Sequence, residues 1–135
     1  PDLPADHVES SSRIIVKKYL EDMMEWMKLS DLLVSLAGHT TCMELASLGI
    51  PSLLIPIENH PEQLKNALKM KKYGIAHVEN MENLNSKNIT NYINKALDDP
   101  DLKEGSANTQ KIFSRYNGTE NASKIISDCI AGKKN

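Results

Sequence analysis

The segment over residues 35–66 constrains the fold of this chain more than any other. A glycine turn at Gly38 leads into an apolar helix over residues 40–48. A buried apolar strand follows over residues 52–57, and Pro61 suits the first position of the next helix. Strands that alternate with helices at this spacing are typical of a parallel sheet, because parallel strands need a crossover between them. The segment therefore predicts a sheet of parallel strands with helices on its faces.

The rest of the chain continues this alternation. Strands are predicted over residues 13–17, 32–36 and 75–78, and helices over residues 21–29, 61–74, 89–97, 101–116 and 122–130. The methionines and the tryptophan of residues 23–27 are expected in the core. Residues 1–12, with two prolines and a serine run, are predicted to be a loop or a frayed end. We therefore expect one α/β domain over residues 13–135, with flanking helices and a helical C-terminal tail.

Composition and charge argue against several classes of protein. The net charge is −2 with acidic and basic residues interspersed, so no nucleic-acid partner is predicted. The apolar runs are far shorter than the ~20 residues that a helix needs to cross a bilayer. Cys42 and Cys129 lack metal-ligand spacing, so no metal site is predicted, and so few cysteines favour a reducing compartment. The chain begins at Pro1, and we expect it to be a piece of a longer protein.

Two polar loops, over residues 37–41 and 58–63, each follow a predicted strand and precede a predicted helix. Right-handed crossovers place the loops after parallel strands on one edge of the sheet, where ligands of such sheets bind. We therefore expect both loops to face the same crevice. An anionic, hydroxyl-rich ligand such as a nucleotide sugar suits this arrangement, because helix amides hold phosphate and carboxylates hold ribose hydroxyls.

The first loop carries the residues that would meet a phosphate. Gly38 lets the backbone turn and approach a phosphate without a Cβ in the way. Thr40 and Thr41 are predicted at the N-cap, where their hydroxyls either satisfy the free helix amides or donate to a phosphate resting on them. His39 is either a surface histidine or a source of charge beside a diphosphate. Glu44, predicted near the end of the first turn, is the only acid of its helix, although acids are common there because they favour the helix dipole.

The second loop leads to a pair of polar side chains. Glu62 and Gln63 lie in the first turn of the next predicted helix, and Asn66 lies one turn further along the same side. Acids are ordinary in a first turn, so Glu62 by itself indicates little. An acid beside an amide is nevertheless a pair that can hold the hydroxyls of a sugar.

Together, these pieces resemble a known family. The pattern Gly-x-x-Thr-x-x-Glu, then Gly-x-Pro and a strand ending in Ile-Pro, then Glu-Gln-x-x-Asn-Ala, is similar to the donor-binding half of GT-B glycosyltransferases. The glycosyltransferase family 28 C-terminal domain, which includes MurG-type N-acetylglucosaminyl transferases and diacylglycerol galactosyltransferases, resembles it most. The similarity covers residues 13–80 by motif and the helical tail by length and pattern only. It implies a Rossmann-like sheet that binds a UDP-sugar.

The resemblance implies a role for each matching residue. Nucleotide contacts would come from Tyr19 and Leu20 at the uracil, Gly38 and Thr41 at the α-phosphate, and Glu44 at the ribose, with His39 and Thr40 in the same loop. Donor-sugar contacts would come from Glu62 and Gln63, with His60 and Asn66 nearby. MurG-type enzymes carry two amides where this chain has Glu62 and Gln63, whereas plant enzymes carry an acid and then an amide. The resemblance therefore leaves the sugar open.

The family's enzymes have two Rossmann-like domains, and the acceptor site and the candidate base belong to the N-terminal one. The resemblance thus implies that catalytic residues lie in a missing N-terminal domain or a partner subunit, and that a UDP-sugar is bound as substrate without a tightly bound cofactor. It also implies a cytoplasmic location, either free in the cytoplasm or at the cytoplasmic face of the membrane through the missing half. Three alternatives remain: a non-catalytic nucleotide-sugar-binding subunit that needs a partner chain, an α/β domain without a ligand, and an epimerase of the same fold. Such epimerases usually carry a Ser-Gly-Gly-x-x-Glu-Glu type of loop, which residues 37–41 do not match.

Overall fold

Three short parallel strands form the sheet of residues 14–132, the part of the chain that the computed structural model describes. They are β1 (Leu33–Ser35), β2 (Ser52–Leu54) and β3 (Ala76–Val78), in the order β1-β2-β3. Leu33 pairs with Ser52, and Ser52 with Ala76. All three residues of the central strand β2 are buried, as expected of a parallel strand covered on both faces.

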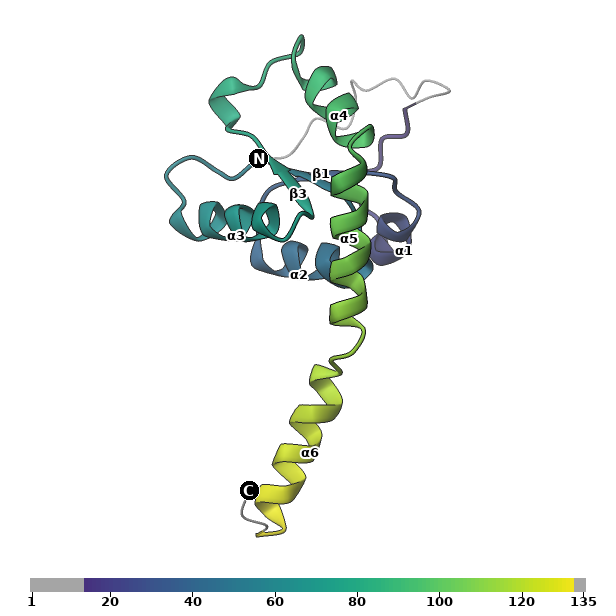
Figure 1. Ribbon diagram of the computed structural model, residues 1–135, viewed down its shortest axis with the longest axis vertical. Coiled ribbons are helices and arrows are strands. Elements are labelled where there is room, and N and C mark those ends of the chain that lie inside the picture. The colour runs from purple at the N-terminus through teal and green to yellow at the C-terminus, as the bar shows by residue number, and fades with distance from the viewer. Residues whose placement is uncertain (1–13, 133–135) are drawn as a thin grey trace.

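Helices cover both faces of this sheet. They are α1 (Met23–Lys28), α2 (His39–Leu48), α3 (Pro61–Lys72), α4 (Ile89–Leu97), α5 (Pro100–Phe113) and α6 (Gly118–Ile130), with a short 3-10 helix, η1, at Met81–Asn83. Figure 1 shows α2 and α3 below the strands and α4 above them, while α5 runs down one side toward α6. The predicted α/β fold, a parallel sheet with flanking helices and a helical C-terminal region, is confirmed.

The core lies where α2 and α3 meet the sheet. Its largest fully buried apolar side chains are Leu45, Leu54 and Ile75. The turn between α3 and β3 lies so close to the middle of α5 that a Cβ on Gly105 would collide with the backbone of Gly74. Gly105 thus allows α5 to lie against the turn after α3, which encloses this core from the side.

The predicted strand over residues 13–17 is wrong for the residues that are described. Residues 14–17 form no strand, and Ile14, Ile15 and Val16 are 56%, 72% and 48% exposed. A β-branched run has a high strand propensity, but it forms a strand only where a neighbouring strand can pair with it. No strand of the described residues pairs with this segment. Arg13 and the predicted loop over residues 1–12 lie outside the described residues.

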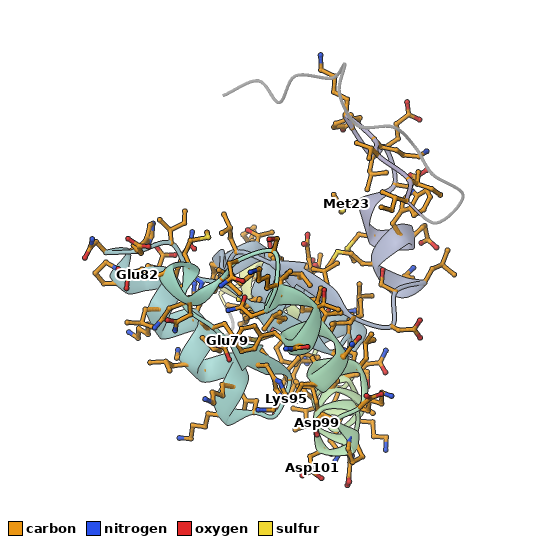
Figure 2. All side chains as sticks on the ribbon, turned by 90° about the horizontal axis from the view of Figure 1, so that it is seen from above. Met23, Glu79, Glu82, Lys95, Asp99 and Asp101 are labelled. Atoms are coloured by element: carbon orange, nitrogen blue, oxygen red, sulfur yellow. The ribbon has the colours of Figure 1, made fainter. Side chains whose placement is uncertain are left out.

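The predicted core position of the methionine and tryptophan cluster is also wrong for most of its members. The helix forms, as α1, but only Met27 of it is buried. Met23, Met24 and Trp26 are 50%, 40% and 42% exposed, and Figure 2 shows Met23 on α1 at the edge of the molecule. Apolar spacing identifies the apolar face of a helix, but it does not show that another element within residues 14–132 packs against that face.

The C-terminal helix α6 also has an exposed apolar face. It forms over the predicted residues, yet it has no buried residue, and Ile125, Ile126 and Ile130 are 55%, 59% and 82% exposed. Figure 1 shows it extending away from the other elements. Within the described part of the chain, its apolar face is therefore not part of the core.

Candidate functional site

The two polar loops lie at one edge of the sheet, as predicted. One follows β1 and leads to α2, and the other follows β2 and leads to α3, so both leave the carboxyl ends of parallel strands. A hydrogen bond joins them directly, because Asn66 Nδ2 donates to the carbonyl oxygen of Ala37 at 3.2 Å. Ala37 is fully buried and comes immediately before Gly38. The second turn of α3 therefore holds the loop from which α2 begins.

The start of α2 differs from the prediction in one respect. Thr40 and Thr41 do not cap the helix: Gly38 is the N-cap, and no side chain makes a capping hydrogen bond there within the described residues. Because glycine offers no side-chain oxygen, the first backbone N–H groups of α2 have no such acceptor. The φ of Gly38 is −63°, so its backbone needs no glycine, and a Cβ there would meet only Thr41 Oγ1, at 3.9 Å. What Gly38 provides is open space in front of free amides.

Glu44 lies in the second turn of α2, and not near the end of the first turn as predicted. Because α2 begins at His39, its first turn holds no acid, and Glu44 belongs to the second turn. Its side chain is half-buried, and neither ion pair seen among residues 14–132 includes it. His39 and Thr40 are exposed, and Thr41 is half-buried. Because this half-buried carboxylate has no ion-pair partner among the described residues, it can accept from hydroxyl groups of a ligand.

The start of α3 is closed by its own side chains. His60 is the N-cap, and its Nδ1 accepts from the backbone N–H of Gln63 at 3.3 Å. Gln63 Oε1 accepts in turn from the backbone N–H of Ile57 at 3.1 Å, so the amide of Gln63 points its NH₂ group away from that bond. Glu62 is exposed in the first turn. These contacts fix the loop while leaving the Glu62 carboxylate and the Gln63 NH₂ group free to meet a ligand.

A depression of about 360 Å³ lies beside this second loop. It is lined by residues 56–61 and Leu64, and also by Asn80, Met81 and Glu82, which come after β3. Figure 2 shows Glu82 well away from Asp99 and Asp101, which lie together at the start of α5. We did not predict residues 80–82, although a polar segment after the predicted strand 75–78 has the same sequence signal as the other two loops.

Among the described residues, no hydrogen bond joins Tyr19 or Leu20 to either of the two polar loops. Tyr19 is 77% exposed and Leu20 is half-buried. Their proposed contact with a base therefore stays a prediction.

A second cavity, of about 340 Å³, lies between α2, α3 and α5. Its lining is mainly apolar and includes Cys42, Met70 and Phe113, and it reaches His39 and Asn66 at the first loop. Burial raises the pKa of the Cys42 thiol, so this group is a packing residue here rather than a thiolate nucleophile.

One hydrogen-bonded pair, His77 and Asp99, supports the frame of the site without belonging to it. His77 of β3 donates from Nε2 to Asp99 Oδ2 at 2.7 Å, and Asp99 also caps α5 by accepting from the amides of Asp101 and Leu102. The hydrogen bond from His77, and then that from Leu102, hold the pKa of Asp99 below its usual range. This pair fixes α5 to the end of the sheet.

Two classes of site find no support in the part of the chain that is described. Its histidine, cysteine, aspartate and glutamate side chains form no group able to hold a metal ion. Of the helices in residues 14–132, none is both long and apolar enough to cross a membrane.

These features define an α/β domain with a parallel sheet, and α/β domains of this class commonly bind ligands at the edge where the strands end. Comparison with known proteins narrows this class. Residues 2–122 match the family described as the glycosyltransferase family 28 C-terminal domain, and the chain belongs to this family.

Individual relatives agree with this assignment. The chain is 31% identical, over 134 residues, to the UDP-N-acetylglucosamine--N-acetylmuramyl-(pentapeptide) pyrophosphoryl-undecaprenol N-acetylglucosamine transferase of Oenococcus oeni, covering 96% of this chain and 35% of that protein. It is 35% identical over 81 residues to an uncharacterized glycosyltransferase of Methanopyrus kandleri, covering 60% of this chain and 24% of the relative. The chain thus spans about a third or less of the length of these two relatives.

Solved structures show the same fold. Spinosyn forosaminyltransferase SpnP superposes with a TM-score of 0.81 at 17% identity, over 96% of this chain and 33% of that one. The glycosyltransferase VinC in complex with dTDP superposes with a TM-score of 0.68 at 17% identity, over 78% of this chain and 26% of that one. The predicted membership of family 28 and the GT-B type of fold are therefore confirmed.

Proposed function

We propose that this chain is the donor-binding part of a UDP-dependent glycosyltransferase, which transfers a hexose or an N-acetylhexosamine to a lipid or glycan acceptor. The observation that carries the proposal is the uncapped start of α2, held by Asn66 of α3 at the same edge of the sheet. Membership of family 28 supports it, and so does the Oenococcus oeni relative, which is named as an N-acetylglucosamine transferase.

In this proposal the first loop binds the diphosphate and ribose. The free amides at the start of α2 and the Thr41 hydroxyl donate to the phosphates, and the positive end of the helix dipole favours their charge. Glu44 accepts from the ribose hydroxyls. Because the leaving group of the transfer is UDP, these donors also stabilise the charge that develops on it as the bond to the sugar breaks.

The second loop reads the donor sugar. The Glu62 carboxylate accepts from sugar hydroxyls, and the free NH₂ group of Gln63 donates to them. Asn66 acts mainly by holding Ala37, while its side-chain oxygen can still accept from the ligand. Tyr19 and the main chain of Leu20 meet the base. The donor sugar is substrate, and the residues that activate the acceptor belong to a part of the protein outside these 135 residues.

We further propose that the remaining part of the protein carries the acceptor site, and that it brings the enzyme to the cytoplasmic face of the membrane. The length of the relatives, of which this chain spans 24% and 35%, supports the existence of that further part. The proposed membrane location rests on the lipid-linked acceptor in the name of the Oenococcus oeni relative. A chain that binds donors but acts only with a separate partner subunit would show the same donor binding, so the two cases differ only in the covalent continuity of the protein.

Calorimetric titration of this chain with UDP and with UDP-sugars tests the proposal. We expect weak binding of UDP, because the proposed contacts to base, ribose and phosphate all belong to this chain, while the proposed closing domain does not. We also expect no sugar transfer to a lipid or glycan acceptor by this chain alone, because proximity and a positioned base supply much of the rate. Absence of UDP binding would contradict the donor site, and turnover by this chain alone would contradict the division of labour.

A further inference from the structure

The outer face of α3 combines exposed leucines with unpaired lysines. Leu64 and Leu68 are 46% and 53% exposed and lie one turn apart on the same side of the helix. With Pro61, Lys65, Lys69 and Lys72 they line a shallow, mainly apolar depression. The exposed leucines therefore lie beside positively charged side chains.

The positive charge of α3 is local. The helix carries Lys65, Lys69, Lys71 and Lys72 against a single acid, Glu62, although the net charge of the whole chain is −2. Neither of the two ion pairs seen within residues 14–132 involves a residue of α3. By contrast, the two lysines of α5, Lys103 and Lys111, are accompanied by two acids. The lysines of α3 are therefore not neutralised by carboxylates of the described residues.

We propose that this face of α3 lies against an anionic lipid surface. A helix whose exposed leucines are bordered by lysines suits such a surface, because the leucines enter the boundary between headgroups and acyl chains. The long lysine side chains extend along the apolar surface and place their ammonium groups among the lipid phosphates. The proposal needs neither the UDP-sugar nor the assignment of the donor site.

This orientation has a consequence for the proposed site. The first turn of α3 carries Glu62 and Gln63 and is capped by His60 of the second loop. A membrane against the outer face of α3 therefore lies beside the depression at the second loop, which is lined by Pro61 and Leu64 as well. A lipid-linked acceptor would then reach the donor from the membrane surface itself.

Vesicle flotation of this chain tests the proposal. The vesicles are made of phosphatidylcholine alone or of phosphatidylcholine with phosphatidylglycerol. We expect binding to the anionic vesicles only, and we expect added salt to weaken it. The variant Lys65→Glu/Lys72→Glu should bind at least about tenfold more weakly, because each basic residue near an anionic surface contributes roughly fivefold.

The variant Lys103→Glu/Lys111→Glu on α5 is the matched control, since it makes the same change in net charge on another exposed helix face. It should bind vesicles nearly as well as the unchanged chain, and Leu68→Ser should bind less well than the control. Equal losses in the two double variants, or equal binding to neutral and anionic vesicles, would overturn the proposal. UDP titration of the same variants distinguishes this failure from a failure of the proposed donor site, because neither pair of lysines belongs to that site.

Discussion

Two loops leave the same edge of the sheet, and they prepare the helices that follow in opposite ways. α2 begins at Gly38, which offers no side chain to the first amides, whereas α3 begins at His60, whose ring accepts from the Gln63 amide at 3.3 Å. Gln63 in turn accepts from Ile57 at 3.1 Å. The backbone amides at the start of α2 can therefore bind an anion as ligand. At the start of α3, an amide is already bonded to His60, and only polar atoms outside these contacts can meet a ligand.

This contrast predicts a division of ligand contacts. Substitutions at the first loop should lower the affinity for UDP and for every UDP-sugar, because these ligands share the UDP part. Substitutions at the second loop should lower the affinity for UDP-sugars only. Variants of Glu44, Asn66 and Gln63 test whether this division is real.

Replacing Glu44 should have the largest effect. Glu44→Gln should lower the affinity for both UDP and UDP-sugars by about 1–3 kcal/mol, because a charged hydrogen-bond partner of the ribose is lost. The thermal midpoint should change little, since Glu44 has no ion pair within the described residues. Calorimetry on this variant, with Glu104→Gln on α5 as control, measures the effect. A variant that unfolds readily yet binds UDP normally would make Glu44 a structural residue.

Replacing Asn66 should show whether this residue acts by holding the loop before α2 or by contacting the donor sugar. Asn66→Ala removes the donor to the Ala37 carbonyl and should weaken UDP and UDP-sugar alike, by about 1–2 kcal/mol, because the loop before α2 is released. The nitrogen shift of the Gly38 amide, which shares a peptide group with that carbonyl, should move as well. Asn94→Ala on the exposed side of α4 should change neither quantity. A loss confined to the UDP-sugar would mean that Asn66 acts by direct contact with the sugar.

Two variants of Gln63 should divide its roles. Gln63→Glu keeps an oxygen that can accept from Ile57 but loses the NH₂ donor, whereas Gln63→Ala loses both. We expect each to weaken UDP-sugar binding by about 1 kcal/mol while UDP binding stays nearly unchanged. Comparing titrations with UDP and with UDP-sugar gives the answer, and equal losses for the two ligands would refute the division between the loops.

The start of α5 offers a smaller test on stability alone. Asp99 caps α5 and accepts from His77, and these bonds lower its pKa. Its stabilising contribution is therefore present above the usual aspartate pKa of about 3.9 and is lost as the pH falls through the lowered value. Asp99→Asn, whose side chain can still cap, should be less stable than the unchanged chain at neutral pH, with a difference that shrinks below about pH 4. Urea unfolding across this range, with Asp101→Asn as control, measures it. A difference independent of pH would contradict this account.

The sequence predicted most of the fold because its signals there are local. Gly49 and Pro61 mark the end and the start of helices, and both boundaries were right to within a residue. The predicted burial of residues 14–17 and of most of α1 was wrong, because apolar spacing identifies a face but not the surface that covers it. In the described residues these faces have few or no partners.

The candidate site was predicted in outline but not in its hydrogen bonds. The spacing of the strands placed both loops at one edge, and the Asn66 bond to Ala37 agrees with this. The N-cap was predicted at Thr40 and Thr41 but lies at Gly38. Threonine is a good N-cap by propensity, but the backbone conformation decides where the helix begins. That Gln63 and His60 would contact their own loop could not be inferred, since side-chain orientation depends on the folded backbone.

The open start of α2 is the central claim, and titration of the isotope-labelled chain with UDP, followed through its amide signals, tests it most directly. We expect the largest shifts at His39, Thr40 and Thr41, whose amides form the first turn of α2, and small ones at Glu62 and Gln63. Replacing UDP by a UDP-sugar should then add shifts at Glu62 and Gln63 without removing the first set. Shifts from UDP concentrated at the start of α3, or none at the start of α2, would contradict the account.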